Sequence, residues 1–241
     1  MLDRLAHLAR TFESQDDVAA ATHEVCKAAV EIVGGAAVSA GITLVRHRRR
    51  VETVAATSDL ARNGDDLQYE LGEGPCLDAA WEEPQVYAGD LRHDARWPTW
   101  GPRVVHDLGV NSMLCTQLFT NENTIGALNV YAADKDAFDS DDRDNLRLLG
   151  AHAAVAVAAA QQIDSLKIAV DRRTTTGTAI GIVMERYGVT NDQALALLRR
   201  LSQDENRKLA DIAHELVDTG NLRMGQRNGV TREKDPGPPT T

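Results

Sequence analysis

Cysteines and histidines are the residues of this chain best suited to redox, nucleophilic or metal chemistry, and their spacing limits what they can do. Cys26, Cys76 and Cys115 form no C-x-x-C pair and have no regular spacing. This argues against a disulfide framework and a structural zinc site. Cys76 lies in the tight GEGPC turn before an expected helix, where a lowered pKa would let a thiol sense oxidants. The alternative is a small buried apolar side chain.

Catalytic and metal-binding patterns are absent from the sequence. His93 and His106 have no partner at the spacing of haem or metal ligands. The acidic run 134–144 lacks the order of a calcium loop, and capping of a helix N-terminus explains it better. There is no G-x-S-x-G, H-E-x-x-H or G-x-x-x-x-G-K-[ST] sequence. We therefore predict no catalytic residue, no metal, no cofactor, and a protein that is not an enzyme.

Composition is that of a soluble globular protein whose two parts differ in charge. Hydrophobic residues make up 43% and charged residues 26%, with a net charge of −10. Residues 165–241 contain 12 of the 26 basic and 10 of the 36 acidic residues, so nearly all the net negative charge lies before them. The sequence has neither 18 consecutive apolar residues nor a signal-peptide start. We expect a cytoplasmic protein with no membrane partner.

The C-terminal third predicts three amphipathic helices. Apolar residues recur there at i, i+3, i+4 and i+7 in three groups, which are Ile180, Val183, Met184 and Tyr187; Ala194, Leu197, Leu198 and Leu201; and Leu209, Ile212, Ala213 and Leu216. Gly188 ends the first helix, and Thr190 with Gln193 forms a capping box for the second. Asn206 is a candidate cap for the third, which Gly220 ends. Since no helix can bury its stripe alone, we expect a three-helix bundle.

A recurring order of small, polar and apolar residues runs through the same segment. It comprises Arg173, Ala179, Gly181, Met184-Glu185-Arg186, Gly188-Val189-Thr190, Ala194, Leu197-Leu198-Arg199, Ser202, Asn206 and Lys208-Leu209. This order resembles the ANTAR domain, and the resemblance implies an RNA-binding module of a bacterial transcription antiterminator. The chain departs from the family at Thr178 and Ile180, where many members carry Gln and Lys, and at Thr176, where an aliphatic residue is usual. Without that Lys one phosphate or base interaction is missing, so affinity or target choice is expected to differ.

Basic residues at the ends of these helices are the expected RNA contacts. They flank the entrance of the bundle, the end of its first helix and the start of its third, where free backbone N–H groups also favour phosphate. These residues are Arg172, Arg173, Arg186, Arg207 and Lys208. For each one, a solvated surface role is the alternative. Tyr187 lies on an apolar stripe, which predicts a core position.

Helix and strand patterns alternate before the bundle. Residues 18–33 predict a helix ending at Gly34-Gly35, and AAVSAGITLV and VETVAAT predict two strands joined by the basic turn 46–50. SMLCTQLFT and TIGALNVYAA predict a second strand pair across the turn NEN. Residues 58–111 are less regular. Helix, hairpin, irregular middle, hairpin and helix indicate an α+β domain with a mainly antiparallel sheet.

Three stretches of this region carry a second resemblance. LGEGPCLDA at 71–79, GALNVYA at 126–132 and the stretch 137–160 are similar to the GAF domain, a small-molecule sensing fold. The resemblance implies a pocket on the sheet face that residues 58–111 cover, with Cys76 and Trp97 as candidate ligand-binding residues for an unknown small-molecule or redox signal. A core role is the alternative for Trp97. Some GAF-fold proteins reduce free methionine sulfoxide, but the cysteine spacing here does not resemble that active site.

One long helix is expected to join the two parts. From Leu146 the apolar positions step through 149, 153, 156, 160 and 163, slip before Leu166, and continue to Val170. Alternation of three and four residues is typical of a coiled-coil seam. We predict one helix over 141–187 that pairs in parallel in a homodimer. The alternative is a buried helix of a monomeric sensor.

Together the two resemblances imply a GAF and ANTAR domain-containing antitermination regulator of a bacterial, actinobacterial type. Its dimer is expected to bind paired stem-loops of a nascent transcript and to act on RNA polymerase indirectly. The expected regions are a helical arm at 1–16, a GAF-like sensor at 17–160, a coiled-coil linker with the ANTAR-like bundle at 161–222, and a disordered tail at 223–241. One alternative is a ligand-sensing protein whose bundle is a dimerisation module. Another, a DNA-binding helix-turn-helix protein, is disfavoured by the acidic third helix.

Overall fold

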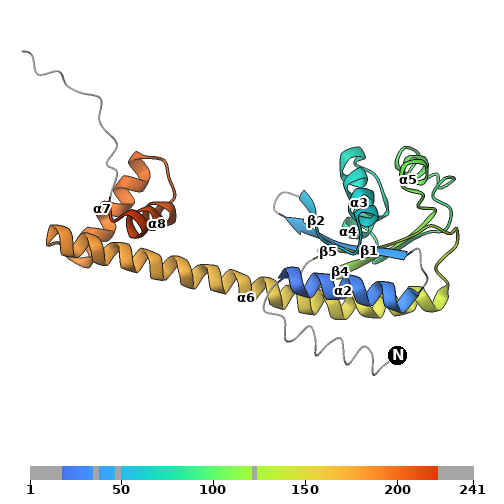
Figure 1. Ribbon diagram of the computed structural model, residues 1–241, viewed down its shortest axis with the longest axis horizontal. Coiled ribbons are helices and arrows are strands. Elements are labelled where there is room, and N and C mark those ends of the chain that lie inside the picture. The colour runs from blue at the N-terminus through green and yellow to red at the C-terminus, as the bar shows by residue number, and fades with distance from the viewer. Residues whose placement is uncertain (1–17, 35–37, 47–49, 121–123, 222–241) are drawn as a thin grey trace, which may run out of the picture. The chain divides into compact units, whose positions relative to one another are not determined.

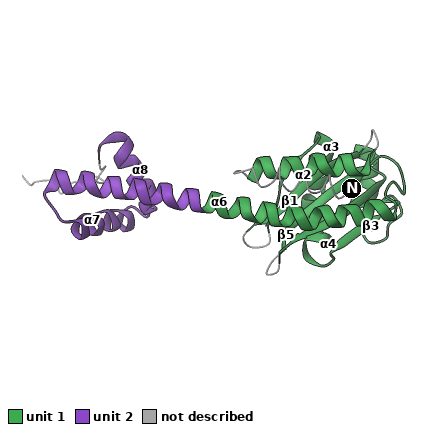
Figure 2. Ribbon diagram, turned by 90° about the horizontal axis from the view of Figure 1, so that it is seen from below, with its two compact units in different colours: residues 1–165 green, residues 166–241 purple. Residues whose placement is uncertain are grey.

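The computed structural model describes residues 18–34, 38–46, 50–120 and 124–221. The chain divides into two compact units, residues 1–165 and residues 166–241 (Figure 2). The expected arm at 1–16, the tail at 223–241 and the centres of both hairpin turns lie outside the described residues.

The first unit is built on one antiparallel sheet of five strands in the order β2-β1-β5-β4-β3. The strands are β1 (Val38–Arg46), β2 (Arg50–Ala56), β3 (Gln85–Ala88), β4 (Ser112–Phe119) and β5 (Thr124–Ala132). Both predicted hairpins are confirmed, since β1 pairs with β2 and β4 pairs with β5. The short edge strand β3 is an addition that the sequence pattern missed, because four residues carry too little alternation to be recognised.

Helix α2 (Val18–Val33) and the first half of α6 (Ser140–Tyr187) cover one face of the sheet (Figure 1). Side chains alternate between the faces of a strand, so every second residue of β1 and β5 points to these helices. The buried set on this side includes Ile42, Leu44, Leu128, Val130, Leu146, Leu149 and Ala153. α2 ends at Gly34 in a left-handed conformation, as predicted.

Three short helices cover the opposite face: α3 (Asp59–Leu71), α4 (Pro75–Trp81) and α5 (Trp100–Leu108). They contribute a second core that includes Trp97, Trp100, Val104, Met113, Cys115 and Tyr131. Residues 58–111 are therefore more regular than the sequence predicted. Gly72 and Gly109 take left-handed conformations at the ends of α3 and α5, which explains why each of these helices is short. The α+β fold class is confirmed.

α6 is a single helix of 48 residues, in agreement with the predicted range 141–187. The proposed seam is wrong over its first half, because Leu146, Leu149, Ala153 and Ala160 are buried and most of them pack in the sensor's own core. Further along, Leu166 and Val170 are exposed. One 18-residue stretch of α6, with mean hydropathy 1.3, is long and apolar enough by composition to cross a membrane, which by itself is weak evidence for a span.

The second unit contains the end of α6 together with α7 (Asn191–Asp204) and α8 (Leu209–Thr219). Their core consists of Ala179, Ile180, Val183, Ala194, Leu198, Ile212, Ala213 and Leu216. Gly188 stops the first helix at a φ of 62°, and Thr190 and Gln193 form the predicted capping box. The cap predicted at Asn206 is wrong: Asn206 takes a positive φ of 52°, and Lys208 occupies the N-cap position of α8.

Candidate functional site: the helical bundle and a buried polar cluster

The predicted RNA-binding residues lie at three places in the helical unit. Arg172 and Arg173 lie on α6 before the bundle core, Arg186 lies near the end of α6, and all three are exposed. Their spacing on one helix places Arg173 and Arg186 about 20 Å apart along the axis, at a rise of about 1.5 Å per residue. Such a separation suits contacts to separate phosphates of an RNA rather than to one phosphate.

Arg207 and Lys208 differ in how free their charges are. The Arg207 guanidinium forms ion pairs with Glu215 at 2.7 Å and with Glu205 at 3.1 Å, and these carboxylates raise the pKa of Arg207. Its carbonyl accepts a 2.5 Å hydrogen bond from the Ser202 hydroxyl. Arg207 thus fastens the loop before α8 to both neighbouring helices. Lys208 is exposed at the start of α8, so it is the better placed of the two to reach a phosphate.

The positions that depart from the family pattern have separate roles. Ile180 is 8% exposed and packs in the core of the bundle, so its side chain contributes to packing rather than to the surface. Thr178 is exposed and donates a hydrogen bond to the Thr174 carbonyl one turn earlier. Tyr187 was expected in the core but is 45% exposed at the last residue of α6, where the helix leaves the packed bundle core. This exposed aromatic residue follows Arg186 directly in the sequence.

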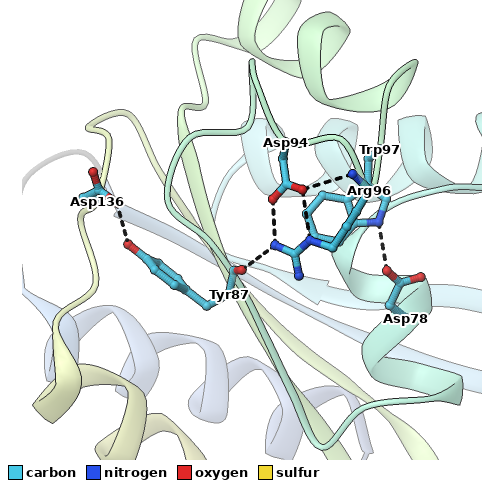
Figure 3. Close-up of polar contacts among 6 residues, drawn as sticks. All are labelled: Asp78, Tyr87, Asp94, Arg96, Trp97 and Asp136. Carbon is cyan, nitrogen blue, oxygen red and sulfur yellow. Dashed lines mark hydrogen bonds and ion pairs between the residues drawn. The ribbon is translucent and has the colours of Figure 1, made fainter.

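In the sensor unit, Trp97 is a structural residue of the loop between β3 and α5. Its indole N–H donates to Asp78 of α4 at 2.9 Å, and its ring meets that of Trp100 edge-on at 6.3 Å between centroids. The Arg96 guanidinium lies 4.2 Å above the Trp97 ring. The same guanidinium donates to Asp94 and to the Tyr87 carbonyl on edge strand β3 (Figure 3). Trp97 is 1% exposed, so these contacts account for it without a ligand.

Cys76 belongs to a cluster of buried polar side chains that sequence reasoning missed. The cluster lies between the sheet and helices α3 and α4, and it consists of Thr43, Thr53, Asp65, Gln68, Tyr69, Cys76, Asn129 and Tyr131. The Cys76 thiol donates to the Thr43 hydroxyl at 3.2 Å and accepts from the Asn129 amide at 3.1 Å. The Cys76 backbone N–H donates to Gln68 at 2.8 Å, which ties α4 to α3.

Burial controls the ionisation of this cluster. It raises the pKa of the Cys76 thiol far above its ordinary value, and Asp65 adds to the rise. Burial also raises the pKa of Cys115, and that of Cys26 to about 12. The surroundings are the opposite of those that generate a reactive thiolate. The geometry therefore favours the small buried side chain over the redox sensor for Cys76.

A surface hollow of about 330 Å³ lies elsewhere, between edge strand β3 and the start of α6. It is lined by Gln85, Tyr87, Ser140, Arg143, Asp144 and Arg147. Arg147 contacts Gln85 at 3.1 Å and Asp144 at 3.6 Å, so its charge is already engaged. Among the described residues, no group of three His, Cys, Asp or Glu side chains could hold a metal ion.

Comparison of the chain with known protein families identifies the two domains. The GAF domain family matches residues 15–158, which is more than half of the chain, and the ANTAR domain family matches residues 164–217. The chain belongs to the GAF family and carries a C-terminal ANTAR domain. The resemblances seen in the sequence are thereby confirmed. A comparison with curated proteins finds no match.

Solved structures agree with the fold of the GAF sensor. The GAF domain of an Acinetobacter phosphoenolpyruvate-protein phosphotransferase has a TM-score of 0.52 at 16% identity, and the match covers 68% of this chain and 96% of that one. The R. palustris bacteriophytochrome RpBphP3 has a TM-score of 0.54 at 9% identity, and the match covers 83% of this chain and 46% of that one. The reduced fRMsr of Staphylococcus aureus has a TM-score of 0.50 at 14% identity, and the match covers 65% of this chain and 94% of that one. At these identities the likeness shows the fold alone.

The two domains together describe a regulator at the level of the family. A GAF sensor followed by an ANTAR domain fits a signal-responsive protein that acts on transcription antitermination. The basic residues predicted to bind RNA lie apart from one another on the exposed surface of the ANTAR domain. The polar cluster of the GAF sensor is enclosed on both sides by packed elements, and its side chains bond to one another.

Proposed function

We propose that this protein is an RNA-binding antitermination regulator that acts as a dimer on paired stem-loops of a nascent transcript. The observation that carries the proposal is the ANTAR match over residues 164–217, directly after a GAF sensor. The protein is not an enzyme under this proposal and acts on RNA polymerase indirectly, in the cytoplasm. The sensor at 17–160 receives the signal, and the segment 161–222 binds RNA.

The proposed RNA surface combines charge with an aromatic ring. Arg172, Arg173, Arg186 and Lys208 supply exposed charges for phosphates, while Arg207 holds the loop that presents Lys208. Tyr187 adds a ring on which an unpaired base of a loop can stack beside the Arg186 guanidinium. Bases splayed out of a loop are the usual targets of specific RNA recognition, and stem-loops present them.

The proposed dimer contact is the outward stripe of α6, defined by Leu166, Val170, Gly177 and Gly181. Steps of four and seven residues keep these positions on one side of the helix. Leu166 is 60% and Val170 is 62% exposed, and a Cβ added at either glycine would meet nothing within 4 Å. Glycine inside a helix costs roughly 1 kcal/mol relative to alanine, and no contact within the described chain explains it here. A second copy of the helix would cover the leucine and valine and approach closely at the glycines.

A second candidate is a ligand-sensing protein whose bundle serves only for dimerisation. The same exposed stripe supports it, because that stripe is apolar and does not require RNA. Removal of positive charge separates the two candidates, since it changes phosphate binding but leaves the apolar stripe intact.

Replacing Arg173 and Lys208 together by alanine is expected to weaken binding to a tandem stem-loop RNA by roughly 100-fold or more, because each hydrogen bond to a charged phosphate stabilises the complex by about 1.5 to 3 kcal/mol. Filter binding or fluorescence anisotropy measures this, with sedimentation to verify that the dimer persists. Arg200→Ala is the matched control, because Arg200 is 77% exposed on α7 and pairs with Asp204 at 3.8 Å. Equal RNA affinity in the double variant and the wild type would contradict the assignment and favour the dimerisation module.

A further inference from the structure

The centre of the polar cluster in the GAF sensor is a carboxylate enclosed on all sides. Asp65 of α3 is fully buried. One oxygen accepts a hydrogen bond from the Thr53 hydroxyl at 2.9 Å. The other accepts from the Asn129 amide at 2.7 Å and from the Tyr131 hydroxyl. Through these hydrogen bonds Asp65 connects α3 to strands β2 and β5, on the face of the sheet that α3 and α4 cover.

The groups that face Asp65 from each packed element are neutral or acidic. Tyr69 of α3, Tyr131 of β5 and Cys76 of α4 keep their protons, because burial raises the pKa of each. Cys115 of β4 is likewise a protonated thiol with a raised pKa, and so is Cys26 of α2, which lies on the other face of the sheet. The acidic neighbour Asp66 is exposed and disfavours ionisation of Asp65.

The nearest basic side chain on the same helix does not neutralise the carboxylate. Arg62 is exposed and sends its guanidinium to the Thr53 carbonyl at 3.3 Å. No ion pair to Asp65 occurs among the residues that the structure describes. A buried carboxylate with only neutral donors is costly when it is charged, and it reduces this cost by taking up a proton.

The cluster is closely packed at three glycines. A Cβ at Gly64 would lie 2.8 Å from the Tyr131 ring, and one at Gly41 would lie 3.0 Å from the Asp65 carboxylate. A Cβ at Gly74, at the start of α4, would lie 2.2 Å from the Gln68 side chain. Gly64 and Gly41 thus allow α3 to pack closely on the sheet, and Gly74 allows the start of α4 to approach α3, so a change of charge at Asp65 acts on this packing.

We propose that the GAF sensor responds to protons through Asp65. Protonation favours the closed packing of α3 and α4 on the sheet, and ionisation favours their opening. The proposal deepens the sensor role given above and rests on the proposed function only for its consequence for RNA. An opened α3–α4 cover would expose Cys76, Gln68 and Asn129, and with them the polar groups of β1 and β5.

The direction of the pH dependence follows from the pKa of Asp65, which burial raises from 3.8 to about 6. A carboxyl group whose pKa is higher in the closed state than in the open state binds its proton more tightly in the closed state. Protonation therefore stabilises the closed state fully at pH values below the ordinary pKa, and this stabilisation is lost as the pH rises through about 6. If the open state has the ordinary pKa, the equilibrium for opening increases roughly tenfold between about pH 5 and about pH 7.5.

Hydrogen exchange of the full chain measures this opening without reference to RNA. Exchange of amides in α3 and α4 is followed at both pH values and corrected for the intrinsic rates, with α2 as internal reference. The wild type is expected to open roughly tenfold more at the higher pH. Asp65→Asn keeps the shape of the protonated acid and should show no such change. Asp66→Asn is the matched control: it removes an exposed charge at the next residue, so the pH dependence should persist and move only slightly, to lower pH, because Asp66 contributes to the raised pKa of Asp65.

A second variant tests the inference even where Asp65→Asn fails to fold. Thr53→Val removes one donor to the carboxylate, so the pKa of Asp65 rises further and the change moves to higher pH. Corrected exchange in α3 and α4 that is independent of pH in the wild type would overturn the proposal. So would the same pH dependence in Asp65→Asn. Loss of RNA binding with the exchange pattern intact would count against the proposed function and leave this inference standing.

Discussion

Leu198→Ala is expected to unfold the ANTAR domain while the GAF sensor stays folded. Leu198 is fully buried in a core of eight buried residues in the described part of the chain, and it and Ala194 are the buried residues that α7 contributes to that core. Truncation of a buried leucine to alanine costs about 2–5 kcal/mol. Since a domain of this size has a stability of only about 5 kcal/mol, that loss removes most of it. RNA binding should disappear with the fold.

Thermal unfolding followed by circular dichroism tests this, because the two domains should give separate transitions. The transition of the helical domain is expected to disappear or to shift well below that of the wild type. Leu197→Ala is the control: the same change at the neighbouring position, 39% exposed, should cost less than about 1 kcal/mol. Equal destabilisation by the two variants would mean that the bundle does not pack as described.

Leu166→Asp combined with Val170→Asp is expected to convert the proposed dimer to a monomer. Both residues lie on the outward stripe of α6, and a parallel dimer would bring two copies of each carboxylate together in an apolar seam. A monomer cannot bind two stem-loops simultaneously. In the dimer, binding of one ANTAR domain raises the effective concentration of the other at the second stem-loop. A monomer lacks this effect, so the affinity for the tandem RNA should decrease by roughly 10²- to 10⁴-fold.

Sedimentation equilibrium gives the mass, and titration with tandem and single stem-loops gives the affinities. Affinity for a single stem-loop should change little, because the RNA surface itself is untouched. Ile168→Asp is the control, since Ile168 is 51% exposed on the same helix but points away from the stripe. If Ile168→Asp dissociated the protein and the stripe variant did not, the seam would lie on another face of α6.

Local patterns were sufficient to predict helices α2 and α6, the start of α7, the end of α8 and both hairpins. Gly188 and Gly220 stop helices through backbone conformations that depend on the residue itself, and the Thr190–Gln193 capping box needs only four residues. The expected cap at Asn206 failed because Ser202 and Arg207 fix the preceding loop through contacts that the spacing does not reveal. Residues 58–111 escaped prediction since their helices are short and packed by distant strands.

The sites depended on contacts between residues far apart in sequence. In the sequence, Asp65 cannot be distinguished from the other polar residues of a polar helix. Its hydrogen-bond partners Asn129 and Tyr131 lie more than 60 residues away along the chain. The apolar repeat from Leu146 to Ala160 has the spacing of a coiled coil, but the sheet of the same domain covers it. Periodicity indicates which face of a helix is buried and not what buries it.

Binding of the purified protein to an RNA with two tandem stem-loops, followed over a salt series, is the most direct test of the central claim. A single-loop RNA and duplex DNA of equal length serve as comparisons. We predict saturable binding to the tandem RNA, a linear decrease of log affinity with log salt concentration that corresponds to a few phosphate contacts, and much weaker binding to either comparison. Equal affinity for all three nucleic acids, or no binding by a folded dimer, would contradict the assignment of this protein as an antitermination regulator.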